Sequence, residues 1–415
     1  MKRIIAIFLV LALCLGMASC ASAGNERHDE TKGDLLLLLP VGKMADEKFL
    51  SAQMDFASEL FRKTAEAEDC KNVLISPLSV MIALAMTANG ANGKTLSQME
   101  DVLGGLAIGD LNQYLTEQIK NLPSGEDYKL QTANSIWARE GELVPKRSYA
   151  EGVKTFYDVE IHERPFNQTT VDEINAWVAE NTDDMIKKVI SGIDEAALLY
   201  LINAVCFDAA WHHPYAEIAV RKHDFTTLDG KIETVDMMHS RENFYISDKN
   251  TTGFIKDYAD HKYQFVALLP NENIDFDDYV SSLTSKKIAG LLASAKAHPV
   301  NAGLPKFENE FEIKLPDILR DMGMIDAFDS NNADFSALSS TPVYINDILH
   351  KTFISVTEER TKAAAVTIVQ AYGVSAPTDP SEPKEVILDR PFVYMIIDRE
   401  TNSPIFMGTV TSIEN

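Results

Sequence analysis

Apolar residues recur at helical spacing near the start of the chain. Residues 45–67 carry one apolar helical face. Its members are Phe49, Met54, Phe56, Leu60 and Phe61. A second apolar helix is predicted to open at residues 76–79 (SPLS), because proline suits a first helical turn, and to end near residues 89–90 (NG). A third, amphipathic helix is predicted over residues 171–189.

Strand-like runs lie between and after these helices, and strands dominate late in the chain. They are residues 135–138, 201–207, 264–269, 351–356, 392–397 and 405–410. Helices that come early and strands that come late indicate a mixed α+β class with a large sheet. No Pro/Gly/Ser-rich linker divides residues 41–415, so we expect one domain there.

The composition is that of a globular protein with an acidic surface. Of 415 residues, 46% are hydrophobic and 24% are charged, which excludes disorder, collagen and coiled coil as the main architecture. Acidic residues outnumber basic ones by 62 to 38, giving a net charge of −24. Such a charge repels phosphate backbones, so nucleic acid is excluded as a partner. The two cysteines of the predicted domain, Cys70 and Cys206, are expected to be separate thiols.

The N-terminus reads as a targeting signal. Lys2 and Arg3 precede an uncharged stretch of 15 residues, which is too short to span a membrane but suits a signal peptide. Residues 17–20 (MASC) resemble the bacterial lipobox, in which the cysteine receives lipid and becomes the new N-terminus. The predicted organisation is therefore a signal peptide at 1–19 and a lipidated Cys20 with a flexible tether at 20–40.

The predicted location of the protein is the bacterial cell envelope or surface, where a lipid on Cys20 would anchor it. The alternative is ordinary cleavage near residues 21–23, which would leave a secreted protein without a lipid. In both cases the chain is exported.

Motifs for catalysis and metal binding are incomplete throughout the sequence. No H-E-x-x-H and no G-x-S-x-G occurs, and the histidines lack metal-ligand spacing. Residues 93–95 (GKT) resemble the end of a phosphate-binding loop, but Ala88 stands where that loop requires glycine. Residues 329–334 lack the turn glycine and the bidentate glutamate of a calcium loop. We expect no catalytic residue, metal or cofactor, although an enzyme without a recognised motif remains an alternative.

The segment from 357 to 391 is the most informative part of the chain. No charge occurs from 363 to 378, and alternate positions from Thr361 to Ala371 are all small or β-branched. A strand with such side chains can enter between two existing strands without displacing much core volume. Taken alone, residues 363–371 also fit an ordinary buried strand.

This segment and its neighbours resemble the serpins, the serine protease inhibitors, over about residues 45–413. The matching segments occur in the family's order: 72–79 (NVLISPLS), 90–95 (GANGKT), 134–137 (NSIW), 174–178 (INAWV) with Thr182, 201–207 (LINAVCF) with Trp211, 304–307 (LPKF), 323–324 (GM) with Phe328, 333–336 (ADFS), 350–351 (HK), 390–392 (RPF) and 404–408 (PIFMG). The resemblance implies a single serpin-type domain over 41–415. Such a domain has a large central β-sheet, smaller sheets, about eight to nine helices and an exposed reactive loop at about 358–386.

The resemblance also implies a mechanism in which this chain is bait and trap rather than catalyst. A target protease attacks the loop and forms an acyl-enzyme. The cleaved loop then inserts into the large sheet as a new strand, and the protease is distorted before water completes hydrolysis. The expected partner is an elastase-type serine protease or a papain-like cysteine protease, bound by a monomer.

Site residues follow from the same resemblance. The hinge that inserts first comprises Glu358, Arg360, Thr361, Lys362, Ala363, Ala364 and Ala365. The shutter cluster, a polar group beneath the sheet where strands must part, comprises Ser76, Ser79, Asn203 and His350. Trp211 matches a tryptophan near the top of the sheet, at the breach where insertion begins.

The family's spacing from the hinge threonine places the reactive bond at Val374–Ser375. A valine after residues 371–373 (AYG) suits a small aliphatic pocket of the elastase type. Tyr372 is the alternative bait and would suit a chymotrypsin-type enzyme.

Two hinge residues depart from the family pattern. Arg360 stands where glycine is usual and Lys362 where an acidic residue is usual. Because Arg360 lacks the backbone freedom of glycine, we expect slower insertion and escape of some protease. This departure also supports the alternative that the protein is a non-inhibitory serpin-fold binding protein or a protease substrate.

Overall fold

Capping side chains set where the predicted helices begin. In the computed structural model, which describes residues 42–122, 128–259, 261–361 and 382–413, Asp46 caps α1 (Glu47–Ala67) by accepting a hydrogen bond from Phe49 N at 3.0 Å. Ser76 caps α2 (Pro77–Ala88), with Pro77 in the first turn. Both helices therefore lie close to where the sequence predicts them.

The described residues contain nine α-helices, in line with the eight or nine expected. Besides α1 and α2 they are α3 (Gly93–Val102), α4 (Ile108–Lys120), α5 (Arg147–Tyr157), α6 (Gln168–Asn181), α7 (Phe276–Ser282), α8 (Ser285–Ala293) and α9 (Pro316–Asp321). Two short 3-10 turns are η1 (Glu217–Ala219) and η2 (Asp326–Phe328).

The strands form two sheets. The six-stranded sheet has the order β10 (Phe307–Lys314), β11 (Leu349–Val356), β12 (Arg360–Thr361), β4 (Leu199–Ala210), β2 (Tyr128–Arg139) and β3 (Glu160–Arg164). The nine-stranded sheet has the order β1 (Leu74–Ile75), β15 (Pro404–Val410), β14 (Phe392–Asp398), β8 (Tyr263–Pro270), β7 (Thr251–Asp257), β6 (Ile232–Ser247), β9 (Lys296–Pro305) and β13 (Lys384–Ile387), with β5 (Val220–Thr226) paired to β6. The mixed α+β class with a large sheet is confirmed.

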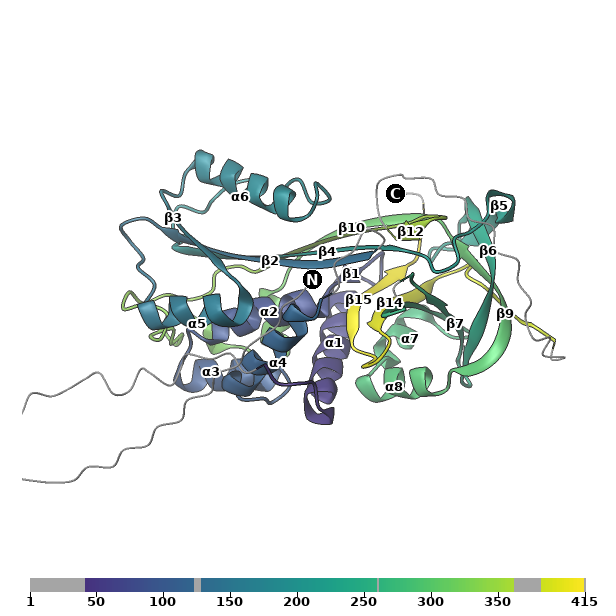
Figure 1. The fold of residues 1–415 in the computed structure, drawn as a ribbon, viewed down its shortest axis with the longest axis horizontal. Helices are drawn as coiled ribbons and strands as arrows, with labels where there is room; N and C mark the ends of the chain where they lie inside the picture. Colours follow the sequence, from purple (N-terminus) through teal and green to yellow (C-terminus); the bar gives the residue numbers. More distant parts are fainter. Residues whose placement is uncertain (1–41, 123–127, 260, 362–381, 414–415) are drawn as a thin grey trace, which may run out of the picture. The chain divides into compact units, whose positions relative to one another are not determined.

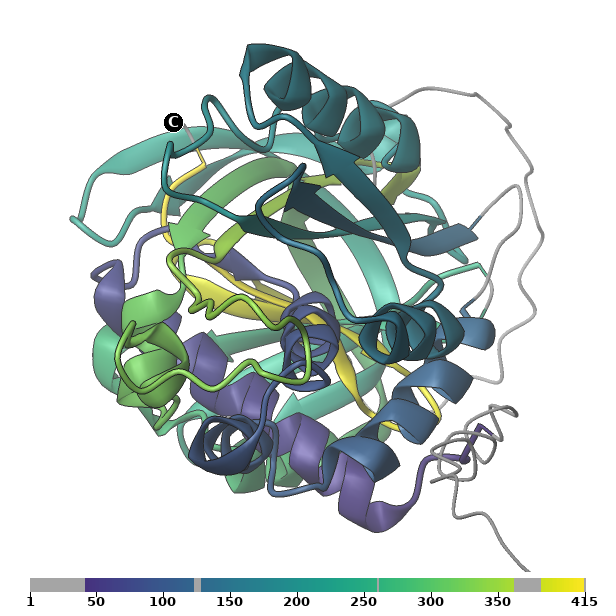
Figure 2. The same ribbon diagram turned by 90° about the vertical axis from the view of Figure 1, so that its left-hand side faces the viewer.

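The six-stranded sheet separates two layers of helices (Figure 1). Helix α6 lies on one face, where a small apolar cluster that includes Trp137, Ile174 and Ile202 packs against it. Helix α2 packs on the opposite face against β4 and β15, with α3, α4 and α5 nearby. Figure 2 shows the same separation from the side. The sheet is therefore supported from both faces.

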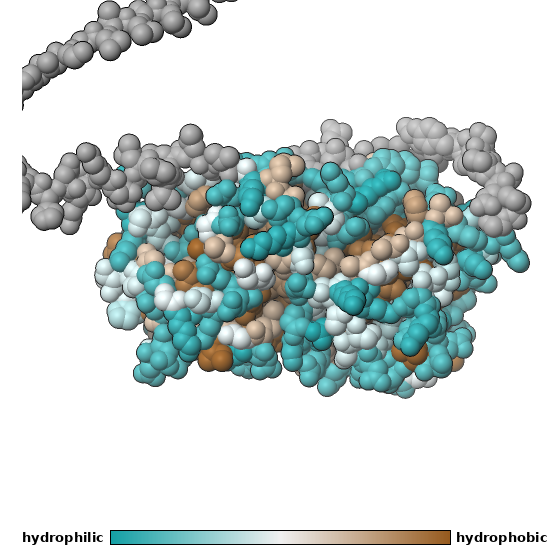
Figure 3. Space-filling view, turned by 90° about the horizontal axis from the view of Figure 1, so that it is seen from below, coloured by the Kyte–Doolittle hydropathy of each residue, from teal (hydrophilic) through white to brown (hydrophobic). Residues whose placement is uncertain are grey.

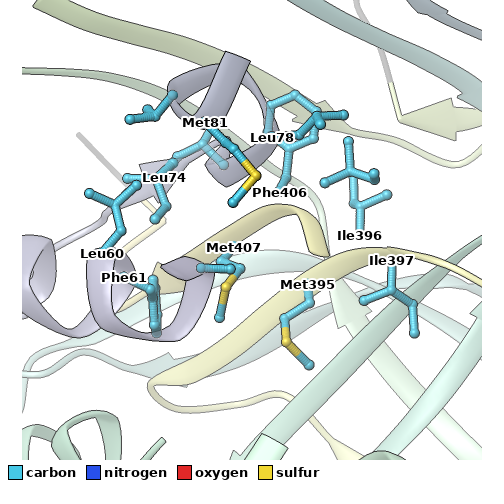
Figure 4. Close-up of a cluster of buried hydrophobic side chains, with 14 of the residues drawn as sticks. Leu60, Phe61, Leu74, Leu78, Met81, Met395, Ile396, Ile397, Phe406 and Met407 are labelled. Atoms are coloured by element: carbon cyan, nitrogen blue, oxygen red, sulfur yellow. The ribbon is translucent and has the colours of Figure 1, made fainter. Parts of the chain in front are cut away.

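The main hydrophobic core contains buried residues of both sheets. Figure 4 shows side chains from α1, β1, α2, β14 and β15 meeting there. They include Phe61, Leu74, Ile396 and Met407, which are all fully buried. Burial of such side chains contributes about 1.5–3 kcal/mol each. On the face shown in Figure 3, hydrophilic residues cover most of the surface, and hydrophobic residues occupy smaller areas between them.

Helix α6 corrects the predicted helix at 171–189. It begins at Gln168 and ends at Asn181, because Asp183 and Asp184 take the left-handed conformation with φ of 49° and 60°. The chain then folds back, since the Asn175 side chain accepts hydrogen bonds from Val189 N at 2.7 Å and from Ile190 N at 3.1 Å. The apolar periodicity beyond 181 reflects this return against α6 and not a longer helix.

Substitution of a glycine in β7 provides a test of the packing of the nine-stranded sheet. A Cβ at Gly253 would lie 2.3 Å from Ala267 O, a backbone atom of the neighbouring strand β8. We expect Gly253→Ala to destabilise the protein by about 2 kcal/mol or more, because the backbone of the neighbouring strand cannot move aside locally. Gly290→Ala in α8 is the matched control, since nothing lies within 4 Å of that Cβ. We expect the control to be neutral or stabilising by up to about 1 kcal/mol. Denaturant unfolding measures both, and equal stabilities would contradict the packing described.

Candidate functional site

A very short strand lies in the middle of the six-stranded sheet. β12 runs antiparallel to both β11 and β4. Arg360 lies opposite Ala210, and Thr361 lies opposite Ala209 and Val356. Thr361 is only 1% exposed. Two residues of the predicted hinge are therefore already part of the sheet.

Strands β4 and β11 are the two neighbours of β12. The long partner of β4 is β2, paired from Tyr128–Ala209 to Ala138–Leu199, and the long partner of β11 is β10. In the described part of the chain, the only strand that joins β4 to β11 is β12. A strand that continued β12 in the same direction would pair with both neighbours along their length.

Trp211 holds the turn that leads into β12. Its indole Nε1 donates to Thr357 O at 2.9 Å, and its backbone N donates to Glu359 O at 3.0 Å. Its ring stacks on Tyr258 with centroids 4.6 Å apart. The Tyr258 hydroxyl in turn lies 2.9 Å from the Thr361 hydroxyl. The predicted breach tryptophan thus binds the two residues that flank Glu358 of the hinge and is linked to Thr361 through Tyr258.

A buried ion pair supports Trp211 from below. Lys256 Nζ lies 2.9 Å from Glu242 Oε1, and the side chains are 2% and 10% exposed. Lys256 also donates to His213 O at 3.0 Å, and its ammonium lies 4.3 Å from the ring centroid of Tyr215 and 5.4 Å from that of Trp211. The cation is thus both paired and in contact with aromatic faces, which offsets its desolvation.

Two further ion pairs fix the hinge itself. Glu358 Oε1 lies 2.8 Å from Lys306 Nζ. Arg360 Nη1 lies 3.4 Å from Asp208 Oδ1, and these two side chains are 19% and 10% exposed. Arg360 is not among the residues with positive φ, so its backbone takes a conformation that any residue adopts. A left-handed backbone, which favours glycine, is therefore not required at position 360 in this conformation.

The shutter cluster is partly assembled. Ser76 N donates to His350 Nε2 at 3.1 Å, and Ser79 N donates to Ser76 Oγ at 3.3 Å. His350 is 6% exposed, and burial lowers the pKa of its imidazole to about 4. Asn203 lies opposite Asn134 in the β2–β4 ladder, but its side chain lies outside the described residues.

Other predicted site residues lie outside the described residues altogether. They are Cys20, Lys362, Ala363, Ala364, Ala365, Tyr372, Val374 and Ser375. Their roles stay predictions. Cys70 is a buried free cysteine, whereas the side chain of Cys206 is not described.

Sequence reasoning missed several residues that hold the hinge. Glu242 lies in β6, Lys256 lies in β7 and Tyr258 is the residue after β7, all far from residue 360 in the chain. No local motif marks them, because their contacts with Trp211 and Thr361 form only when separate strands meet. Asp208 lies only three residues before Trp211, but nothing in the sequence indicates that it pairs with Arg360.

Within the described ranges, no group of His, Cys, Asp and Glu side chains is arranged to hold a metal ion. The helices described there are also too short or too polar to cross a bilayer.

The buried imidazole of His350 predicts a loss of stability in acid. The folded protein keeps it neutral, whereas in the unfolded chain it binds a proton near pH 6.5. Its contribution of about 3 kcal/mol is therefore present above pH 6.5 and lost as the pH falls toward 4. We expect the midpoint temperature of unfolding to fall less steeply across this window in His350→Gln than in the wild type. His223→Gln, on β5, is the control, and parallel curves for wild type and His350→Gln would refute this assignment.

The Lys256–Glu242 pair predicts asymmetric effects of substitution. Lys256→Met leaves the Glu242 carboxylate buried without its cation, and we expect it to cost about 3–5 kcal/mol. The double variant Lys256→Met/Glu242→Leu removes both charges and should cost clearly less. Denaturant unfolding of the single and double variants checks this, and an equal cost for both would contradict a buried, coupled pair.

Comparison with known proteins identifies the family to which this geometry belongs. Residues 51–413 match the family described as Serpin (serine protease inhibitor). An uncharacterized serpin-like protein of Thermococcus kodakarensis is 32% identical, with 98% of each chain covered. Serpin B8 of Homo sapiens is 32% identical over 86% of this chain and 97% of its own length. The crystal structure of Tengpin, a thermophilic serpin, in the native state is 46% identical with a TM-score of 0.84, covering 89% of this chain and 96% of that one. The chain described here therefore belongs to the serpin family.

Proposed function

We propose that this protein is a suicide-type inhibitor of serine proteases whose cleaved loop extends β12 between β4 and β11. The observation that carries the proposal is the position of β12. It is antiparallel to both neighbours, and its Thr361 is buried within the sheet. This geometry supports insertion as a continuation of pairing that has already begun.

The first step is an attack by the protease on the loop. Its nucleophilic oxygen adds to the carbonyl carbon of the bait residue, the peptide bond breaks, and the amine leaves with a proton from the general acid. The bait residue is then esterified to the protease, and the segment before it is free at its far end. That segment can follow β12 into the sheet and carry the protease with it.

Backbone pairing supplies the driving force. Each net ladder hydrogen bond contributes about 1 kcal/mol, so roughly ten inserted residues give on the order of 10 kcal/mol. At about 2 °C per kcal/mol for a large domain, cleavage should raise the midpoint temperature of unfolding by about 20 °C. An ordinary nicked loop would leave that temperature unchanged or lower.

The target class and the bond rest on the sequence. A valine at 374 followed by Ser375 supports an elastase-type target, with Tyr372 as the alternative bait. A papain-like cysteine protease is a second possible target class, since it also forms an acyl-enzyme.

The N-terminal sequence supports a cellular address for this activity. A signal peptide at 1–19 and lipidation of Cys20 would place the inhibitor at the bacterial cell envelope, where it would act on external proteases. Cleavage near residues 21–23 would instead release it.

The first test mixes the mature domain with an elastase-type protease. We expect a band stable in SDS at the summed mass and, by mass spectrometry, cleavage after Val374. Cleavage without complex formation by elastase-, chymotrypsin- and trypsin-type enzymes would contradict inhibition and support a non-inhibitory serpin-fold protein.

Thr361 provides a sharper test of insertion. Thr361→Arg puts a long cation into a buried site that holds a hydroxyl beside Tyr258. We expect cleavage to continue while the stable complex falls at least tenfold, because insertion stalls at its first residues. Thr234→Arg is the matched control, since Thr234 is an exposed strand threonine. A wild-type yield of complex from Thr361→Arg would count against this route of insertion.

A further inference from the structure

We propose that Asp208 and Arg360 form a hinge ion pair that keeps β12 paired in the sheet, so that Arg360 is a positioning residue for loop insertion. The part that concerns insertion rests on the function proposed above. The part that concerns the ion pair rests on geometry alone.

The register of β12 places the two charges on one face of the sheet. Arg360 lies opposite Ala210, and Asp208 lies two residues from Ala210 on the same strand, β4. Residues two apart in a strand share a face, so Arg360 and Asp208 form a diagonal cross-strand pair. Arg360 Nη1 lies 3.4 Å from Oδ1 and 3.5 Å from Oδ2 of Asp208.

Thr361 fixes the opposite face of the same strand. It lies opposite Ala209 and points to the other side, where its hydroxyl meets that of Tyr258. β12 is thus held from both faces, by an ion pair on one and by a buried hydroxyl contact on the other. Backbone pairing over only two residues would otherwise be a weak hold.

Partial burial strengthens the ion pair. Arg360 and Asp208 expose 19% and 10% of their side chains, far less than a typical surface pair. Solvent and salt therefore screen their attraction less than that of exposed charges. The neighbouring Lys306–Glu358 pair is more exposed, at 35% and 30%.

Arginine suits this position better than glycine would. The backbone at 360 does not use the left-handed region, so glycine would add only freedom to the unpaired hinge. Glycine would also remove the cation that faces Asp208. Arginine therefore lowers the entropy of the released hinge and adds an attraction to the paired one.

A paired hinge has a consequence for insertion. Closing the turn between β11 and β12 is the costly first step of adding a strand, and later residues then add one after another. A strand that lengthens from the present register, with Arg360 opposite Ala210 and Thr361 opposite Ala209, would keep the Asp208–Arg360 contact. The ion pair therefore favours the start of insertion without opposing its progress.

Hydrogen exchange measured by mass spectrometry tests the ion pair in the uncleaved mature protein. We expect Arg360→Gly and Asp208→Asn to speed exchange of the amides at 357–361 about tenfold relative to the wild type. Arg360→Lys and the charge-exchanged double variant Asp208→Arg/Arg360→Asp should keep most of the protection. Arg164→Gln, which breaks an ion pair with Glu173 away from the hinge, is the control and should leave these amides unchanged. Wild-type exchange in Arg360→Gly would overturn the proposal.

A second measurement tests the role in insertion. The ratio of inhibitor cleaved to protease trapped should at least double in Arg360→Gly and return toward the wild-type ratio in Arg360→Lys. An unchanged ratio despite faster exchange would show that the ion pair does not position the loop for insertion. If the wild type traps no protease, the proposed function fails, and the exchange experiment still decides whether the ion pair holds β12.

Discussion

Backbone pairing at the centre of the six-stranded sheet is the constraint on which the rest of the structure depends. β4 and β11 each have one long partner, and among the described strands they share only β12 between them. Buried backbone groups need hydrogen-bond partners, so a strand at this place completes the ladder for both neighbours. The short β12 occupies this place over two residues and runs antiparallel to both neighbours.

Polar groups gather at the places where these strands meet the rest of the molecule. Near β12 the Lys256–Glu242 pair lies under Trp211, and nearer the other end of β11 His350 accepts a hydrogen bond from Ser76 N. Satisfied buried polar groups contribute little net stability, but they penalise alternative arrangements in which they lose their partners. They therefore favour the register that the strands of the sheet have in this structure.

The hinge shows how one unusual residue is accommodated by another. Taken from the sequence alone, Arg360 is a departure that removes the freedom of glycine. In the fold its backbone belongs to strand β12 and its guanidinium faces Asp208. Arg360 thus restricts the backbone when the hinge is unpaired, and it forms an ion pair when the hinge is paired. The sequence shows only the restriction, because the ion pair depends on the neighbouring strand β4.

Much of the fold could be read from the sequence, because its signals are local. Helical periodicity in α1, the Ser76–Pro77 start of α2 and the apolar runs of the late strands need no distant partner to be recognised. The ordered motifs identified the family, and with it Trp211, His350 and the hinge. Tertiary structure decided the rest. After helix α6 ends at Asn181, the chain folds back and its backbone binds the Asn175 side chain. Tyr258, Lys256 and Asp208 join the site because separate strands bring them there. The sequence by itself determined the elements and the family. The packing of strands decided which side chains hold the hinge, because contacts between residues far apart in the chain leave no periodic or spacing signal.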